Sequence, residues 1–161
     1  MGILYYDDWM SVDTRHHEHS PNAQELRALF TEHGLRSTRQ REVIYQSLLG
    51  TKEHPTAEEL LELVHTHDPE VSQATIYNSL EAFVGCGLAN RIPSPISGGA
   101  CRYDADIGSH VHLVLDDGRV MDVPMDLSQQ ILNAVPAHVL EELAQRTGVE
   151  LSGVKVELFG K

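Results

Sequence analysis

Four short stretches with helix-start signals, followed by a loop rich in proline and glycine, constrain the fold of this chain most strongly. In each stretch a capping side chain precedes apolar residues at helical spacing. The four caps are Asn22, Thr38, Thr56 and Ser72. Thr56 and Glu59 also have the spacing of a capping box. A small group of helices followed by a two-stranded ribbon predicts a winged helix-turn-helix.

The rest of the chain predicts a mixed α+β fold. The strands of the ribbon are expected at 88–92 and 100–105, with the loop between them. Further on we expect a hairpin (110–115 and 119–123), a helical stretch (126–146) notched by Pro136, and a last strand (149–159). The predicted organisation is an N-terminal winged helix-turn-helix domain over 21–104 and a small α/β domain over 105–161. A unit as small as the second commonly dimerises.

Charge and composition limit the partners. Acidic residues outnumber basic ones by 24 to 12, for a net charge of −12, which argues against a generic polyanion binder. A narrow basic strip is still possible, because Arg36, Arg39 and Arg41 lie within six residues. Residues 1–20 predict a flexible N-terminal arm and not a signal peptide, and no apolar run is long enough for a membrane span.

The two cysteines, Cys86 and Cys101, form no CxxC pair. Two free thiols suit a reducing compartment, so we expect a cytoplasmic protein. Both cysteines are expected to be small buried residues, with redox sensing as the alternative.

A metal site is indicated by the sequence HVH. His110 and His112 are two residues apart, so on a strand both imidazoles project from one face. If the hairpin has a three-residue loop ending in Gly118, His112 lies opposite Asp122 on that face. A two-residue turn would move Asp122 to the other face. The metal hypothesis therefore predicts the three-residue loop.

Several segments, taken in order, resemble the ferric uptake regulator (Fur) family of metal-dependent repressors. They are GLRSTRQREVIYQSL, HPTAEEL, VSQATIYNSLEAFVGCGL, RYD, HVH and GRVMD, and the resemblance covers about Gly34 to Asp122 and, more weakly, the chain onward to Phe159 and Gly160. It implies a homodimer, not an enzyme, in which an N-terminal winged helix binds double-stranded operator DNA and the C-terminal α/β domain dimerises. A metal bound between the domains would set the DNA-competent shape.

The resemblance adds His54 and Asp104 to the metal site. The full predicted set is His54, Asp104, His110, His112 and Asp122. This mixed nitrogen and oxygen set suits one Fe(II) or Mn(II) per chain, and Zn(II) could also bind. Aspartate as the last ligand resembles the peroxide-sensing branch of the family. In that branch iron-bound peroxide oxidises ligand histidines, here His54 and His110.

Departures from the family pattern leave alternatives open. Typical members carry CxxC just after HxH for a structural zinc, but here that place reads Leu115-Asp116-Asp117, so we expect no structural zinc. Iron response regulators of the family, which bind haem, also lack CxxC, so a haem-responsive regulator is one alternative. A metal-dependent hydrolase or oxygenase built on HVH is another. It would leave the winged helix unexplained, and the sequence has no nucleophile elbow, phosphate loop or HExxH.

The fourth helix, which begins at about Ser72, is the predicted recognition helix. The N-terminal residues of a recognition helix reach base edges in the major groove. By resemblance, Tyr77 contacts bases, and neighbouring polar side chains bond to bases or phosphates. Arg39 and Arg41 would contact phosphates, and Arg36 would enter the minor groove. The predicted DNA-binding residues are Arg36, Arg39, Arg41, Ser72, Gln73, Thr75, Tyr77 and Asn78.

Overall fold

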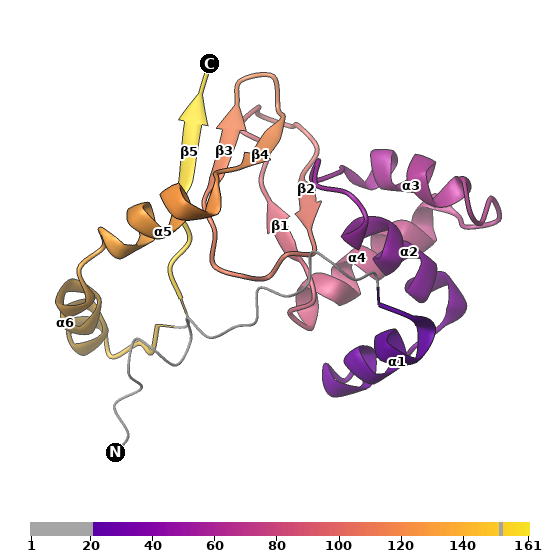
Figure 1. Cartoon of the computed structure of the whole chain (residues 1–161), viewed down its shortest axis with the longest axis horizontal. Helices are drawn as coiled ribbons and strands as arrows, with labels where there is room; N and C mark the ends of the chain where they lie inside the picture. The colour runs from indigo at the N-terminus through magenta and orange to yellow at the C-terminus, as the bar shows by residue number, and fades with distance from the viewer. Residues whose placement is uncertain (1–20, 152) are drawn as a thin grey trace.

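The computed structural model describes residues 21–151 and 153–161, which fold into a helical half and a sheet-containing half (Figure 1). The helical half contains α1 (Ala23–Glu32), α2 (Arg39–Leu49), α3 (Ala57–His65), α4 (Gln73–Gly85) and the ribbon of β1 (Asn90–Ile92) and β2 (Arg102–Asp104). The other half contains β3 (His112–Leu115), β4 (Val120–Asp122), α5 (Met125–Asn133), α6 (Ala137–Thr147) and β5 (Glu157–Gly160). Among the described residues, no helix has the length and apolar character needed to cross a membrane.

The helices of the first half begin where the capping residues predict. The side chains of Asn22, Thr38, Thr56 and Ser72 each accept a hydrogen bond from a backbone N–H in the first turn of their helix. The predicted capping box of Thr56 is present. These caps pair N–H groups that have no partner within the helix, so the start of each helix is fixed locally.

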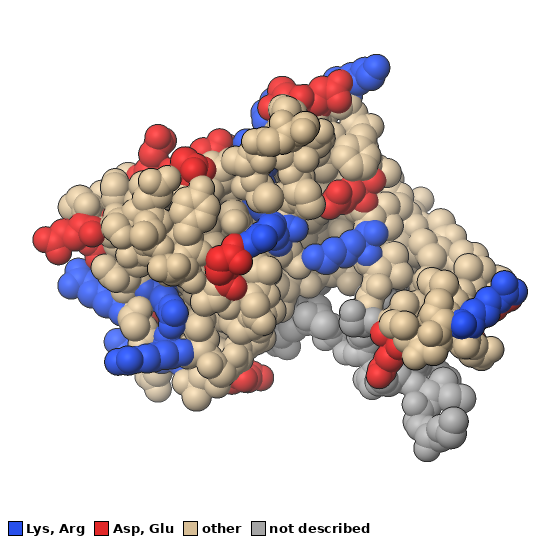
Figure 2. All heavy atoms as spheres, turned by 180° about the vertical axis from the view of Figure 1, so that it is seen from behind, with Lys and Arg blue, Asp and Glu red and all other residues tan. Residues whose placement is uncertain are grey.

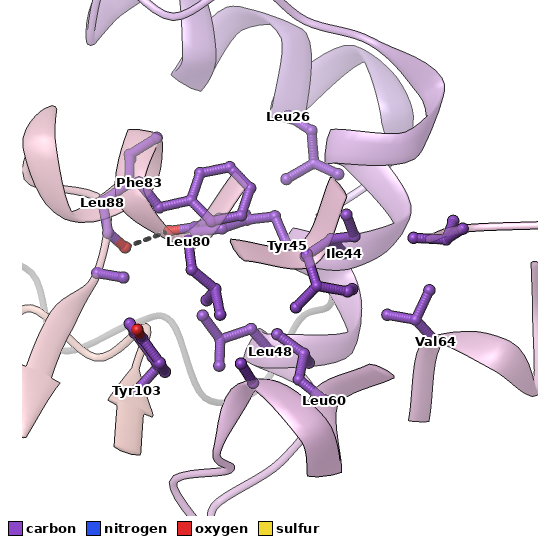
Figure 3. Packing of buried hydrophobic residues seen from close by; sticks show 14 of the residues in the cluster. Leu26, Ile44, Tyr45, Leu48, Leu60, Val64, Leu80, Phe83, Leu88 and Tyr103 are labelled. Carbon is purple, nitrogen blue, oxygen red and sulfur yellow. Dashed lines mark hydrogen bonds between the residues drawn. The ribbon is translucent and has the colours of Figure 1, made fainter. Parts of the chain in front are cut away.

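The helical half has its own hydrophobic core (Figure 3). The rings of Phe30, Tyr45 and Phe83 lie 5.0–5.8 Å apart between centroids, within the usual range of aromatic pairs. The Tyr45 hydroxyl donates a hydrogen bond of 3.0 Å to the carbonyl of Leu88, which joins α2 to the segment before β1. Cys86 and Cys101 are half-buried against this core rather than buried within it.

The sheet of the second half has the order β4-β3-β5, with β4 antiparallel and β5 parallel to β3. His112 pairs with Asp122, and the Leu115 N–H donates to the Arg119 carbonyl across the turn at 2.9 Å. Gly118 ends the turn at φ +84°, in the left-handed region. The predicted three-residue loop is therefore confirmed.

Other elements of the second half are shorter than predicted. β5 covers only Glu157–Gly160, so the expected strand over 149–159 is wrong for most of its length. Val149 and Leu151 are exposed in this segment, because the four residues of β3 pair only with Glu157–Gly160. β3 begins at His112, and the helical stretch is divided into α5 and α6 at Pro136.

The ribbon lies between the helices and the sheet and joins the two halves (Figure 1). Ile92 of β1 packs with Val114 and Val120 in a small buried cluster. Nζ of Lys155 donates a hydrogen bond of 2.7 Å to Oδ1 of Asn90. The domain boundary at 104/105 stays a prediction, and the arm predicted over 1–20 lies outside the described residues.

Candidate metal centre and nucleic-acid interface

The structure brings together the five residues predicted as metal ligands, at the junction of the two halves. His54 lies in the loop before α3, and Asp104 ends β2. His110 precedes β3, His112 begins it, and Asp122 ends β4. The first four side chains are at most 11% exposed, whereas that of Asp122 is 39% exposed and forms the outer rim.

The three Nε2 atoms face two carboxylate oxygens at short range. Nε2 of His54 lies 3.0 Å from Oδ1 of Asp122, and Nε2 of His110 lies 3.1 Å from Oδ2 of Asp104. The Nε2 atoms of His110 and His112 are 2.8 Å apart. Ligand atoms that surround one ion at about 2.1 Å lie about 3.0–3.4 Å from their neighbours. His54, Asp104, His110 and His112 have ligand atoms that all lie within 4.8 Å of one another, so these four donors fit around a single cation.

Backbone groups orient two of the donors. Oδ1 of Asp104 accepts a hydrogen bond of 2.8 Å from the Asp106 N–H, so Oδ2 faces the imidazoles. Nδ1 of His110 lies 2.9 Å from the Gly108 carbonyl, which can only accept, so Nδ1 carries the proton. When the ring is neutral, as a metal ligand must be, the lone pair of Nε2 therefore faces the cluster.

His54 is held in an uncommon conformation. Its φ is +48°, the only positive value for a non-glycine residue in the described part of the chain. It also precedes Pro55, and a residue before proline ordinarily takes an extended conformation. Its Nδ1 is buried without a hydrogen-bond partner. Such strain and an unpaired buried polar atom are typical of functional positions.

The carboxylates and imidazoles of the cluster stabilise each other's charge. Burial opposes charge on His54 and His110, but their hydrogen bonds to the two aspartates outweigh it. The pKa of His54 is thereby raised to about 9 and that of His110 to about 10. Burial also opposes charge on Asp104 and Asp122, but hydrogen bonds from the imidazoles hold the pKa of both carboxyls well below the usual range. A cation bound at this cluster would therefore displace protons.

A cavity of about 30 Å³ adjoins the cluster. His54, Asp104, Asp122 and Lys52 are among the residues that line it. The volume is about that of one small molecule such as water. A small polar ligand could therefore reach the donor atoms from this side.

The predicted DNA-binding residues lie at the starts of two helices. Ser72 caps α4, with its Oγ bonded to the N–H and hydroxyl of Thr75. Tyr77 is 40% exposed, and its hydroxyl donates a hydrogen bond of 2.7 Å to Glu58 of α3. Gln73 and Asn78 are exposed on the same helix.

The arginines lie just before and within the first turn of α2. Arg36 and Arg39 are exposed, and Nη1 of Arg41 donates a hydrogen bond of 2.8 Å to the Arg36 carbonyl. Figure 2 shows several Lys and Arg side chains close together at the lower left, over the helical half. The acidic chain thus carries a local basic surface.

Two side chains, Glu58 and Arg102, make contacts that were not predicted from the sequence. Glu58 holds the Tyr77 hydroxyl, and Arg102 contacts the carbonyls of His54 and Gly118. The position of Arg102 two residues before Asp104 is the only sequence signal for the second contact, because side chains two apart on a strand share a face. The first depends on how α3 packs beside α4, which no local pattern specifies.

The chain matches the ferric uptake regulator family over residues 32–159. The peroxide-responsive repressor PerR of Staphylococcus aureus is 29% identical over 153 residues, or 94% of this chain and 95% of that protein.

Solved structures of similar proteins include the ferric uptake regulators of Vibrio cholerae and, with manganese, of Pseudomonas aeruginosa. The first is 27% identical with a TM-score of 0.61, over 84% of this chain and 98% of that one. The second is 26% identical with a TM-score of 0.63, over 83% and 95%. A zinc-bound manganese uptake regulator is 30% identical with a TM-score of 0.57, over 84% and 96%.

These matches confirm the predicted fold class, an N-terminal DNA-binding domain followed by a C-terminal dimerisation domain. They also agree with a His/Asp cluster that could hold one metal. Members of the matched family are transcriptional regulators and not enzymes. The chain belongs to the ferric uptake regulator family.

Proposed function

We propose that this protein is a homodimeric repressor whose binding to operator DNA depends on one divalent metal per chain. The observation that carries the proposal is the convergence of five donor side chains from both halves of the molecule. His54 and Asp104 belong to the helical half and its ribbon, whereas His110, His112 and Asp122 belong to the sheet half. A cation held by both sets would favour one arrangement of the two halves.

The donor set favours Fe(II) or Mn(II). Three imidazole nitrogens and two carboxylate oxygens form a mixed shell, which first-row divalent metals accept, and Zn(II) would bind as well. Two of the similar structures were solved with manganese or zinc. With only two cysteines in its sequence, the chain cannot build a four-cysteine zinc site of its own.

Operator DNA would meet the starts of α2 and α4. We assign base contacts to Tyr77, because the N-terminal residues of a recognition helix reach the major groove. We assign hydrogen bonds to bases or phosphates to Ser72, Gln73, Thr75 and Asn78. We assign backbone contacts to Arg39 and Arg41 and a minor-groove contact to Arg36. The exposure of Tyr77 and the local basic surface of the helical half support this assignment.

A second copy of the chain would cover the sheet half. α6 buries none of its residues, although Val139 and Leu143 are large and apolar. Phe159 on β5 is 69% exposed. A single chain leaves these side chains in water, and a two-fold dimer could bury both copies of the same face. We therefore assign domain roles as DNA binding for 21–104 and dimerisation for 105–161.

Peroxide is the proposed second signal. The relatives in Staphylococcus aureus are named peroxide-responsive repressors. In this chain, the small cavity beside His54 could admit a molecule the size of peroxide. Oxidation of His54 or His110 would remove a donor and thereby weaken the link between the two halves.

The proposal is tested by measuring DNA affinity by fluorescence anisotropy. The probe is a duplex selected from a random library by the Mn(II)-loaded protein. Fe(II), Mn(II), Zn(II), haem and a chelator are compared side by side, and His110→Ala is compared with His138→Ala, which changes a histidine on α6. We expect Mn(II) and Fe(II) to tighten binding at least tenfold, and His110→Ala to abolish that gain while His138→Ala keeps it.

Two results would contradict the proposal. Equal DNA affinity in Mn(II) and in chelator would exclude a metal-dependent repressor, and a response to haem alone would favour the haem alternative. Peroxide sensing is tested by adding peroxide to the Fe(II) form and analysing peptides by mass spectrometry. We expect added oxygen on His54 or His110, and unmodified histidines with oxidised cysteines would assign the sensor to Cys86 or Cys101 instead.

A further inference from the structure

Arg102 on β2 contacts three separate segments that meet at the metal-site candidate. Its Nε donates a hydrogen bond of 2.6 Å to the Gly118 carbonyl in the turn between β3 and β4. Its Nη1 donates to the His54 carbonyl at 2.9 Å and to the Glu59 carboxylate at 2.9 Å. The side chain is 16% exposed. One guanidinium therefore joins the loop before α3, the first turn of α3 and the β3–β4 hairpin.

The contact with the His54 carbonyl supports the strained part of the site. His54 has a positive φ and precedes a proline, so its backbone would relax without support from its surroundings. Arg102 holds the carbonyl of this residue, and the Tyr103 N–H holds the next carbonyl, that of Pro55, at 3.0 Å. Together these bonds fix the direction in which the imidazole of His54 leaves the chain.

The contact with the Gly118 carbonyl acts on the hairpin of β3 and β4. The turn that ends in Gly118 sets the register that pairs His112 with Asp122. By binding the Gly118 carbonyl, Arg102 attaches this hairpin to the ribbon of the helical half. Asp104 lies two residues beyond Arg102 on the same strand, so its carboxylate is placed by the same β2 backbone.

The chemistry of the contact requires arginine. A guanidinium has five donors in a rigid plane, whereas a lysine ammonium is a compact charge that cannot span acceptors so far apart. Glu59 balances the charge, and its Oε2 also accepts from the N–H of Thr56 in the capping box of α3. The guanidinium is thereby tied to a helix start that is itself fixed.

We propose that Arg102 is a positioning residue that assembles the metal site by joining its two halves, without being a ligand. This rests on the proposed function of the cluster as a regulatory metal site. Because Arg102 fixes the backbone on both sides, the donors meet before a metal arrives, and less ordering remains to oppose binding. Arg102 thereby contributes to metal affinity and to the domain arrangement that binds DNA.

The test compares Arg102→Gln and Arg102→Lys with Arg91→Gln, a matched change on the neighbouring strand of the ribbon. Arg91 pairs with Glu81 of α4 and contacts no donor of the cluster in the described interactions. Mn(II) affinity is measured from the free-ion signal in electron paramagnetic resonance. We expect a fall of about tenfold or more in Arg102→Gln and nearly as much in Arg102→Lys. Arg91→Gln should stay within twofold of wild type.

A second readout separates positioning from a general loss of structure. Amide exchange in the metal-free protein should accelerate in residues 52–55 and in the hairpin turn of Arg102→Gln, while the core helices α2 and α4 keep wild-type rates. Excess Mn(II) should restore its DNA binding to the wild-type level. If the variant does not fold, Glu59→Gln replaces it, because glutamine keeps the capping contact but removes the charge. We expect a two- to fivefold loss of Mn(II) affinity there.

Failure of the proposed role of Arg102 can be told apart from failure of the proposed function. A wild-type protein whose DNA binding ignores Mn(II) contradicts the proposed function itself. A wild type that responds to Mn(II), together with a folded Arg102→Gln of unchanged Mn(II) affinity, overturns only the role of Arg102. If Arg102→Gln does not fold, unchanged Mn(II) affinity in Glu59→Gln likewise overturns the role of Arg102.

Discussion

The helical half and the sheet half of this chain differ in how they bury apolar side chains. In the helical half, α1 to α4 and the ribbon surround a core that includes Phe30, Tyr45 and Phe83. In the sheet half, α6 buries none of its residues, and Phe159 is largely exposed. Of the two buried clusters described, the smaller consists of Ile92, Val114 and Val120, and it takes one member from the ribbon of the helical half.

The two halves are therefore stabilised in different ways. The helical half has enough internal contacts to fold around its own core. The sheet half leaves apolar surface in water and lies against the rest of the molecule through a few contacts beside the metal-site candidate. Its stability should therefore depend on a second copy and, under the proposed function, on metal.

The largest difference between the halves is expected when a phenylalanine in each is changed to alanine and the free energy of unfolding is compared. Phe83 is completely buried, so Phe83→Ala should lower the free energy of unfolding by about 3–5 kcal/mol. Phe159→Ala should lower the free energy of unfolding of the helical half by less than about 1 kcal/mol, because Phe159 does not belong to the helical core. Urea unfolding followed by circular dichroism measures both. Equal losses would contradict the division into a packed and an unpacked half.

A charge on the exposed face should dissociate the proposed dimer. Phe159→Glu places a carboxylate in each copy of the expected interface, so the dimer dissociation constant should rise about 100-fold, equivalent to about 2.7 kcal/mol. Phe159→Leu should keep the dimer. Sedimentation velocity over a concentration series gives the result, and a Phe159→Glu protein that stays dimeric would place the interface elsewhere.

Proton release should accompany metal binding at the junction. The pKa of His54 is raised to about 9 and that of His110 to about 10, so both are protonated at pH 7 until a cation displaces the protons. Mn(II) affinity should therefore rise about tenfold or more per pH unit above pH 7 and level off towards pH 9–10. Calorimetry in buffers of different ionisation enthalpy counts the protons, and binding without release would contradict a site at these histidines.

The same pKa shifts predict how pH affects the metal-free fold. A histidine whose pKa is raised in the folded state stabilises that state fully below its ordinary value, 6.5. The contribution should be lost as pH rises through about 9–10. Thermal unfolding in chelator should show this decline for wild type, and His110→Ala should reduce it.

The smallest effect is expected at the proposed DNA surface. Glu58 holds the Tyr77 hydroxyl at the exposed edge of the recognition helix. Glu58→Gln removes a negative charge from each copy there and should tighten DNA binding about two- to fivefold. The same change at Glu141 on α6 should leave affinity unchanged. Weaker binding in Glu58→Gln would instead indicate that its charge orients Tyr77 for base contact.

Much of the fold was predictable because its signals are local. The caps Asn22, Thr38, Thr56 and Ser72 start their helices as predicted, because each side chain bonds to the backbone a few residues away. The register that places His112 opposite Asp122 followed from the length of one turn.

Features that depend on distant packing were not predictable from local patterns. The expected strand over 149–159 forms only at Glu157–Gly160, because its length depends on the edge of β3. The alternation of apolar residues over 149–156 does not show where the edge of β3 will lie. The bonds of Arg102 likewise join segments far apart in the sequence. Convergence of the donors around His54 was expected only from the family resemblance.

The most direct test of a metal shared between the halves is thermodynamic reciprocity. If metal tightens DNA binding by some factor, DNA must tighten metal binding by the same factor. Mn(II) affinity is therefore measured with and without the selected duplex, and duplex affinity with and without Mn(II). We expect two equal ratios of at least tenfold, both reduced to about one in His54→Ala. Ratios of one in the wild-type protein would contradict coupling between the metal site and the DNA surface.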